Sequence, residues 1–103
     1  MSALFSPLDI GPITAPNRIA IGPMCQYSAD DGCASDWHMQ MLMNYCMSGA
    51  GTVVMEATAV TREGRISLGC LGLYSDANEY ALARVVRAAR SVALPGVKIG
   101  IQI

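Results

Sequence analysis

Cys25 and Tyr27 are the residues of this sequence whose types and position best suit chemistry. They follow an apolar strand candidate, Arg18–Gly22, which Pro23 ends because proline cannot donate to a strand ladder. A thiol in a loop can contact a ligand and be deprotonated or oxidised, and a phenol can donate a proton or a hydrogen bond. Two other interpretations stay open: Cys25 as a small buried apolar side chain and Tyr27 as a packed loop aromatic.

Three further polar residues stand in apolar surroundings and need hydrogen-bond partners. Gln102 lies in an apolar run, where its amide would bond to a neighbouring strand or loop, or to a ligand. Glu56 closes the apolar run Thr52–Met55, and we expect a structural salt bridge or covered polar contact there rather than a catalytic base. His38, beside Trp37, is expected to be structural, as a capping or hydrogen-bonded side chain.

The other chemically capable groups are expected to be solvated or structural. Arg62, Glu63 and Arg65 flank Gly64, a pattern typical of a solvated turn. Four of the seven methionines fall within residues 39–47, and we expect them to fill gaps in a core. The four cysteines have none of the clustered spacings that zinc or iron–sulfur sites use, so no metal site is expected.

Composition and charge exclude several classes of function. The 103 residues are 52% hydrophobic and 15% charged, with a net charge of −1, so bulk electrostatics attract neither nucleic acid nor anionic membrane. No apolar stretch reaches the roughly 18 residues that a transmembrane helix needs. The N-terminus lacks the pattern of a secretory signal, and we expect a cytoplasmic protein without nucleic-acid or membrane partners.

The chain alternates between strand and helix patterns. Residues 3–16 are expected to form short extended pieces and turns, and residues 57–75 a long loop. The predicted regular elements are a strand at 18–22, a helix at 37–48 capped by Asp36, a strand at 52–56, a helix at 77–92 capped by Ser75 or Asp76, and a strand at 97–103.

This order predicts an α/β fold with parallel strands joined by right-handed crossovers. About three β/α units are present, whereas a (β/α)8 TIM barrel has eight strands. We therefore expect residues 1–103 to be a single, incomplete N-terminal part of such a barrel, preceded by a short extended segment. A doubly wound sheet is the alternative, but Pro23-Met24-Cys25 stands where its Gly-rich phosphate turn would be.

An ordered series of short motifs resembles the opening of the old yellow enzyme family of reductases. The series covers essentially the whole chain: Leu4-Phe5 with Pro7, Asn17-Arg18-Ile19, Pro23-Met24-Cys25-Gln26-Tyr27, Glu56-Ala57-Thr58-Ala59-Val60, Gly64-Arg65-Ile66, Ser75-Asp76 and Gly100-Ile101-Gln102. The Cys-x-Tyr spacing after Pro-Met is similar to the thermophilic-like subgroup, which includes xenobiotic reductases.

The resemblance implies an oxidoreductase that holds FMN non-covalently in a TIM barrel. NADPH or NADH reduces the flavin, which passes a hydride to the β-carbon of an alkene activated by a carbonyl or nitro group. Cys25 would tune the flavin, and Tyr27 would face the substrate with Ile66. The implied flavin-binding residues are Gly22, Pro23, Met24, Cys25, Ala57 and Gln102.

The resemblance also implies that other parts of the site lie outside this sequence, on later strands. We expect the full-length protein to be a homo-oligomeric NADPH dehydrogenase or ene-reductase, and the isolated chain to be inactive and aggregation-prone. The alternative hypothesis is that the chain is a stand-alone, non-catalytic fragment that binds other proteins or takes part in an assembly. An unclosed sheet supports it, because its free edge readily pairs with other chains.

Overall fold

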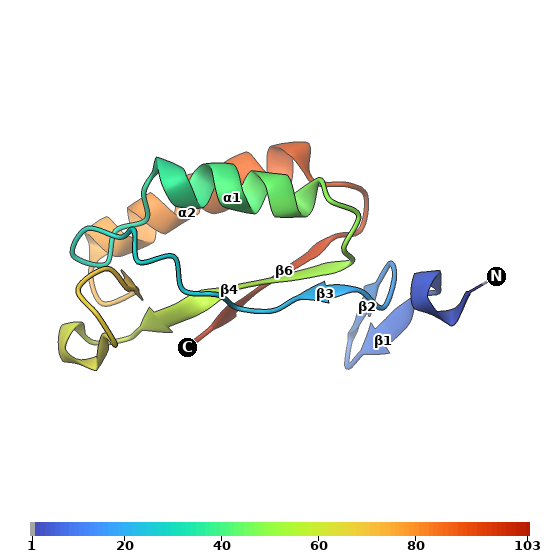
Figure 1. Ribbon diagram of the computed structural model, residues 1–103, viewed down its shortest axis with the longest axis horizontal. Helices are drawn as coiled ribbons and strands as arrows, with labels where there is room; N and C mark the ends of the chain where they lie inside the picture. Colours follow the sequence, from blue (N-terminus) through green and yellow to red (C-terminus); the bar gives the residue numbers. More distant parts are fainter. Residues whose placement is uncertain (1) are drawn as a thin grey trace.

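The computed structural model describes residues 2–103 and places two helices on one face of a small parallel sheet (Figure 1). The strands are β1 (Leu8–Ile10), β2 (Ile13–Ala15), β3 (Ala20–Ile21), β4 (Thr52–Ala59), β5 (Leu71–Gly72) and β6 (Lys98–Gln102). The helices are α1 (Asp36–Cys46) and α2 (Asp76–Val92), with 3₁₀ turns η1 (Ala3–Phe5) and η2 (Arg62–Gly64).

Strands β3, β4 and β6 lie side by side in chain order, and all are parallel. β4 is central: Ala20 pairs with Thr52 on one side, and Thr52 pairs with Lys98 on the other. The helices α1 and α2 form the two crossovers. This is the strand order of the first part of a (β/α)8 barrel, so the predicted fold class is confirmed.

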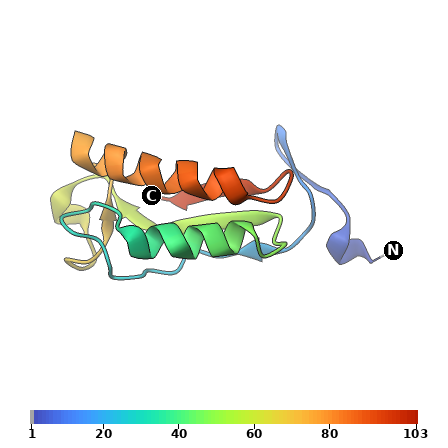
Figure 2. The same ribbon diagram turned by 90° about the horizontal axis from the view of Figure 1, so that it is seen from above.

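The core lies between the sheet and the two helices, which run next to each other over it (Figure 2). An exposed ion pair also joins the helices, with Arg84 Nη2 2.7 Å from Asp36 Oδ1. The fully or almost fully buried apolar side chains come from both helices and from β4 and β5: Leu42, Cys46, Val53, Met55, Leu71, Val85 and Ala89. The opposite face of the sheet carries no helix among residues 2–103.

Ser35, rather than Asp36, is the N-cap of α1, and the helix ends at Cys46, earlier than predicted. Ser35 is extended, and its backbone N–H donates to Nδ1 of His38, 3.0 Å away. Asp36 is the first helical residue, where its negative charge is still favourable. For α2, the Ser75 alternative is confirmed, because its Oγ accepts from the Asn78 N–H at 3.2 Å.

The predicted strand boundaries need two corrections. β4 continues to Ala59 instead of ending at Glu56, because Thr58 and Ala59 pair with the short strand β5 inside the predicted loop. The first parallel strand is only Ala20–Ile21. Before it, the Arg18 N–H bonds to the Leu4 carbonyl, and the predicted extended pieces pair as the antiparallel hairpin β1–β2.

Neither helix among the described residues is long and apolar enough to cross a bilayer.

Candidate functional site

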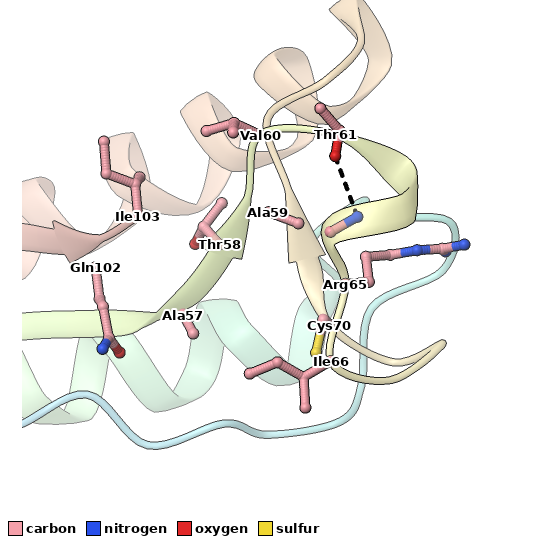
Figure 3. A pocket seen from close by; sticks show the side chains of 11 residues that line it. Ala57, Thr58, Ala59, Val60, Thr61, Arg65, Ile66, Cys70, Gln102 and Ile103 are labelled. Carbon is pink, nitrogen blue, oxygen red and sulfur yellow. Dashed lines mark hydrogen bonds between the residues drawn. The ribbon is translucent and has the colours of Figure 1, made fainter.

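A cavity of about 250 Å³ opens where β4 and β6 end (Figure 3). The carboxyl ends of parallel strands meet at one edge of a sheet, and here Ala57 pairs in register with Gln102. Both residues line the cavity, together with Ile66 from the loop after β4. The structure therefore brings together three of the residues that the sequence singled out.

The loop between β4 and β5 forms the outer wall of the cavity and adds residues that the sequence reasoning missed. In η2, Thr61 Oγ1 accepts a hydrogen bond from the Gly64 N–H at 3.1 Å, drawn as the dashed line in Figure 3. Arg65, which follows this turn, is a lining residue although its guanidinium points away to Asp31, and the buried Cys70 lines the cavity from the same loop. The sequence analysis gave Arg65 and Cys70 no place in the site, since both fall inside the predicted long loop of residues 57–75.

The Cys70 thiol sits in a hydrogen-bonded environment. Burial is the largest single influence and raises its pKa, but hydrogen bonds from Ser67 and from the Ile66 backbone together leave the pKa below its usual value. The backbone N–H of Ser67 lies 3.2 Å from Cys70 Sγ, and the Ser67 hydroxyl lies 3.5 Å from it. The Cys70 thiol, whose pKa is lowered, therefore lines the cavity.

The segment Gly22–Tyr27 runs beside this cavity and is not part of its lining. Gly22, Pro23 and Met24 are exposed, and Cys25 is half-buried. Tyr27 is 65% exposed, and its backbone lies in the left-handed region with φ of 54°. Cys25 and Tyr27 are thus accessible at the carboxyl edge of the sheet, but the described residues do not enclose them.

Gln26 fastens this segment to two neighbouring elements. Its backbone N–H donates to Oε2 of Glu56 on β4, 3.3 Å away. Its side-chain Oε1 accepts from Nε1 of Trp37 on α1 at 2.9 Å, and its Nε2 donates to the Met24 carbonyl at 2.9 Å. Gln26, to which the sequence analysis gave no role of its own, therefore ties the loop that carries Cys25 and Tyr27 to β4 and α1.

A β-bulge at Glu56 decides where that side chain points. Met55 pairs with Ile101 and Ala57 pairs with Gln102, so Glu56 is the extra residue in β4. Met55 and Glu56 are consequently both buried, although they are adjacent in a strand. The bulge turns Glu56 toward α1 and leaves Ala57 at the cavity.

Glu56 and His38 form a buried pair between β4 and α1. Nε2 of His38 lies 3.1 Å from Oε1 of Glu56, and the two side chains are 0% and 1% exposed. The contact is not aligned as a hydrogen bond, and neither atom has another partner within residues 2–103. The predictions of a structural contact for Glu56 and a hydrogen-bonded, structural His38 are confirmed.

Arg62, Glu63 and Gly64 form the exposed turn η2, as predicted, but the side chains of Arg62 and Arg65 also pair with Asp31. Arg62 makes a bidentate contact with Asp31, with Nε–Oδ1 and Nη2–Oδ2 distances of 2.9 Å. Arg65 Nη1 lies 3.5 Å from the same carboxylate, and the Tyr74 hydroxyl donates to it at 2.9 Å. The cluster joins the loops after β3 and β4, which a local pattern could not reveal because 31 residues separate Asp31 from Arg62.

The Asp31 cluster predicts a pH-dependent contribution to stability. The hydrogen bond from Arg62, then that from Tyr74, lowers the pKa of Asp31 from 3.8 to about 2. A carboxyl group with a depressed folded-state pKa stabilises the fold above its unfolded pKa, and this stability is lost as the pH falls through the folded value. Asp31→Asn is therefore expected to lower the urea midpoint of the purified protein at pH 6, with the difference from wild type shrinking between pH 4 and about pH 2.

The matched control is Glu63→Gln, which removes an exposed acid from the same turn. Its urea midpoint should follow wild type across this pH range. A constant difference between Asp31→Asn and wild type from pH 6 to pH 2 would contradict the assignment.

The sequence of the whole chain matches one family model. The model for the NADH:flavin oxidoreductase / NADH oxidase family matches residues 3–103. The chain belongs to this family. Similar curated members are an NADH:flavin oxidoreductase from Gibberella zeae, 42% identical over 97% of this chain, and an NADPH dehydrogenase from Listeria welshimeri, 42% identical over 100% of this chain.

Solved structures of the family share the fold. The old yellow enzyme homologue from Zymomonas mobilis superposes with a TM-score of 0.82 at 26% identity over 97% of this chain, and morphinone reductase with a TM-score of 0.79 at 26% over 96%. The chain spans only 24% and 30% of the two curated relatives, and 27% and 25% of these structures. It corresponds to the N-terminal part of the barrel in this family.

The residues described offer no cluster of three or more His, Cys, Asp or Glu side chains suited to a metal ion. All four cysteines are free thiols.

Proposed function

We propose that this chain is the N-terminal part of an FMN-dependent reductase that uses NADPH or NADH to reduce activated carbon–carbon double bonds. The observation that carries the proposal is the meeting of Ala57, Gln102 and the Gly22–Tyr27 segment at the carboxyl edge of the three parallel strands. In a TIM barrel that edge is where the active site forms. The subgroup proposed is the thermophilic-like one, from the Cys25-Gln26-Tyr27 spacing.

The residues present fit the edge of a planar flavin ring. Small residues leave room at the strand ends: a Cβ built on Gly22 would meet no atom within 4 Å, and Ala57 presents only a methyl group. Gln102 supplies an amide that can both donate and accept at the ring's polar edge. Bound FMN would supply hydride transfer, and these residues would bind and orient it.

The chain's own reactive groups take distinct roles in this proposal. The Cys25 thiol would lie near the flavin and tune its redox behaviour, and Tyr27 would hydrogen-bond the activated alkene. Ile66, at 77% exposed, would pack against the alkene once later strands complete the pocket. Ile66 lines the cavity with Ala57 and Gln102, and Cys25 and Tyr27 lie outside its lining, at the same edge of the sheet.

The first test is a titration of FMN with the purified chain, followed by flavin fluorescence and visible absorption. The same titration is then made with the completed barrel, meaning residues 1–103 joined to the remaining strands of the Listeria welshimeri relative. Saturable binding and NADPH-dependent reduction of an enone by the completed barrel support the proposal. A completed barrel that is folded but binds no FMN would contradict it.

Gln102→Leu in the completed barrel is expected to weaken FMN binding about tenfold, because one or two hydrogen bonds to the ring are lost. The matched control is Gln40→Leu, the same replacement on the exposed surface of α1. Equal affinities for FMN in both variants would remove Gln102 from the flavin site.

A second candidate function is non-catalytic binding to other protein chains. The observation that favours it is the open edge of β6, where Ile101 is 37% and Ile103 is 82% exposed. A chain that is monomeric, unfolds cooperatively and binds no FMN would favour this candidate.

A further inference from the structure

Gln26, which lies between Cys25 and Tyr27, makes three hydrogen bonds. Glu56 accepts from its backbone, Trp37 donates to its side chain, and the same side chain donates back to the Met24 carbonyl. The two outside partners come from β4 and α1, which the core locks together. Gln26 is therefore fixed relative to the sheet even though its loop lies at the surface.

The Glu56 contact is backed by a buried partner. Nδ1 of His38 accepts a hydrogen bond from the Ser35 N–H, which places the ring proton of a neutral imidazole on Nε2. That N–H faces Oε1 of Glu56, while Oε2 accepts from Gln26. One carboxylate oxygen thus lies against His38 on the helix, and the other accepts a hydrogen bond from the loop.

Tyr27 needs such support because its backbone is strained. A φ of 54° is uncommon for a residue with a side chain, and it persists only where surrounding contacts impose it. On one side the contacts come through Gln26. On the other, the Ala29 N–H bonds to the Gly69 carbonyl, and Gly69 packs directly against the Tyr27 backbone.

We infer that Glu56, supported by His38, and Trp37 are positioning residues that act through Gln26 to hold Cys25 and Tyr27 in their working orientation. The inference deepens the proposed function and rests on it for the roles of Cys25 and Tyr27. The contacts of Glu56 and Trp37 with Gln26, which we call the anchor, are a separate claim about structure. The experiments below measure the anchor and the catalysis independently.

Glu56→Gln is the most diagnostic variant because it keeps the shape of the side chain. A carboxylate accepts at both oxygens, whereas an amide has one acceptor and one donor. In either amide orientation an NH₂ group must face an N–H group, of His38 or of Gln26. The variant is therefore expected to lose the contact of residue 56 with either His38 or Gln26, without opening a cavity.

Trp37→Phe tests the other anchor with little risk to folding, because Trp37 is 53% exposed. It removes the indole N–H that donates to Gln26 and keeps an aromatic ring. Tyr45→Phe is the control: it also removes one polar hydrogen from an aromatic residue of α1, on a side chain that makes no contact with Gln26.

Two measurements on the completed barrel separate the claims. In hydrogen exchange, the Gln26 and Tyr27 amides should exchange about tenfold faster in Glu56→Gln and Trp37→Phe than in wild type or Tyr45→Phe. In steady-state kinetics, kcat for an enone should fall about 10- to 100-fold in Glu56→Gln, with KM changed much less, because the reacting groups are misplaced rather than lost.

Unchanged exchange at Gln26 and Tyr27 in both variants would overturn the anchor. Faster exchange with an unchanged kcat would overturn the positioning role while leaving the proposed function intact. A wild-type completed barrel that binds no FMN would overturn the proposed function and with it the catalytic role, while the exchange data would still decide the anchor.

Discussion

His38→Leu is expected to lower the free energy of unfolding by about 3–5 kcal/mol, the loss typical when a buried charge is left without its partner. The substitution leaves the Glu56 carboxylate 1% exposed, with Oε1 facing an apolar side chain. It also removes the acceptor of the Ser35 N–H at the start of α1. Urea denaturation of the purified protein, compared with wild type, measures the loss.

The double variant His38→Leu/Glu56→Met shows whether His38→Leu loses stability because the Glu56 carboxylate has no partner or because side-chain packing is lost. Apolar replacement of both members of a buried pair is often nearly neutral, so the double variant should recover much of the stability lost in His38→Leu. The exposed pair of Asp36 and Arg84 supplies a control, since Asp36→Asn should cost less than about 1 kcal/mol. A double variant less stable than His38→Leu would contradict the pairing.

Gly69→Ala is expected to cost about 1–3 kcal/mol, the range for overpacking a close contact. A Cβ at this position would lie 2.7 Å from the Tyr27 carbonyl oxygen and 2.9 Å from its Cα. These are backbone atoms in a strained conformation, so relief requires the segment of Tyr27 to move. In the completed barrel, kcat for an enone should fall about 100-fold if Tyr27 shifts by about 1 Å.

Gly100→Ala is the matched control for this effect. A Cβ there would lie 3.7 Å from the nearest atom, Cγ2 of Val54, an ordinary van der Waals contact. Its urea midpoint should stay close to that of wild type, and alanine suits a strand better than glycine. Equal midpoints for Gly69→Ala and wild type would contradict the close approach of Gly69 to Tyr27.

Much of the secondary structure was predictable because it depends on local patterns. Leu82, Val85 and Ala89 have the spacing of one helical face, and all three side chains of α2 are buried against the core. The apolar run from Thr52 predicted a parallel strand, and β4 is parallel to both β3 and β6. The resemblance implied Ala57 and Gln102 as flavin-binding residues, and the structure places them in register.

The tertiary structure alone decided how the site is supported. The bulge at Glu56 arises from the register between β4 and β6, and it turns this carboxylate toward His38 on α1. Asp31 and Arg62 meet only because the fold brings two loops together. Periodicity reports contacts within one helix or strand, whereas a register shift or an inter-loop ion pair depends on residues tens of positions apart, so no local pattern in the sequence encodes them.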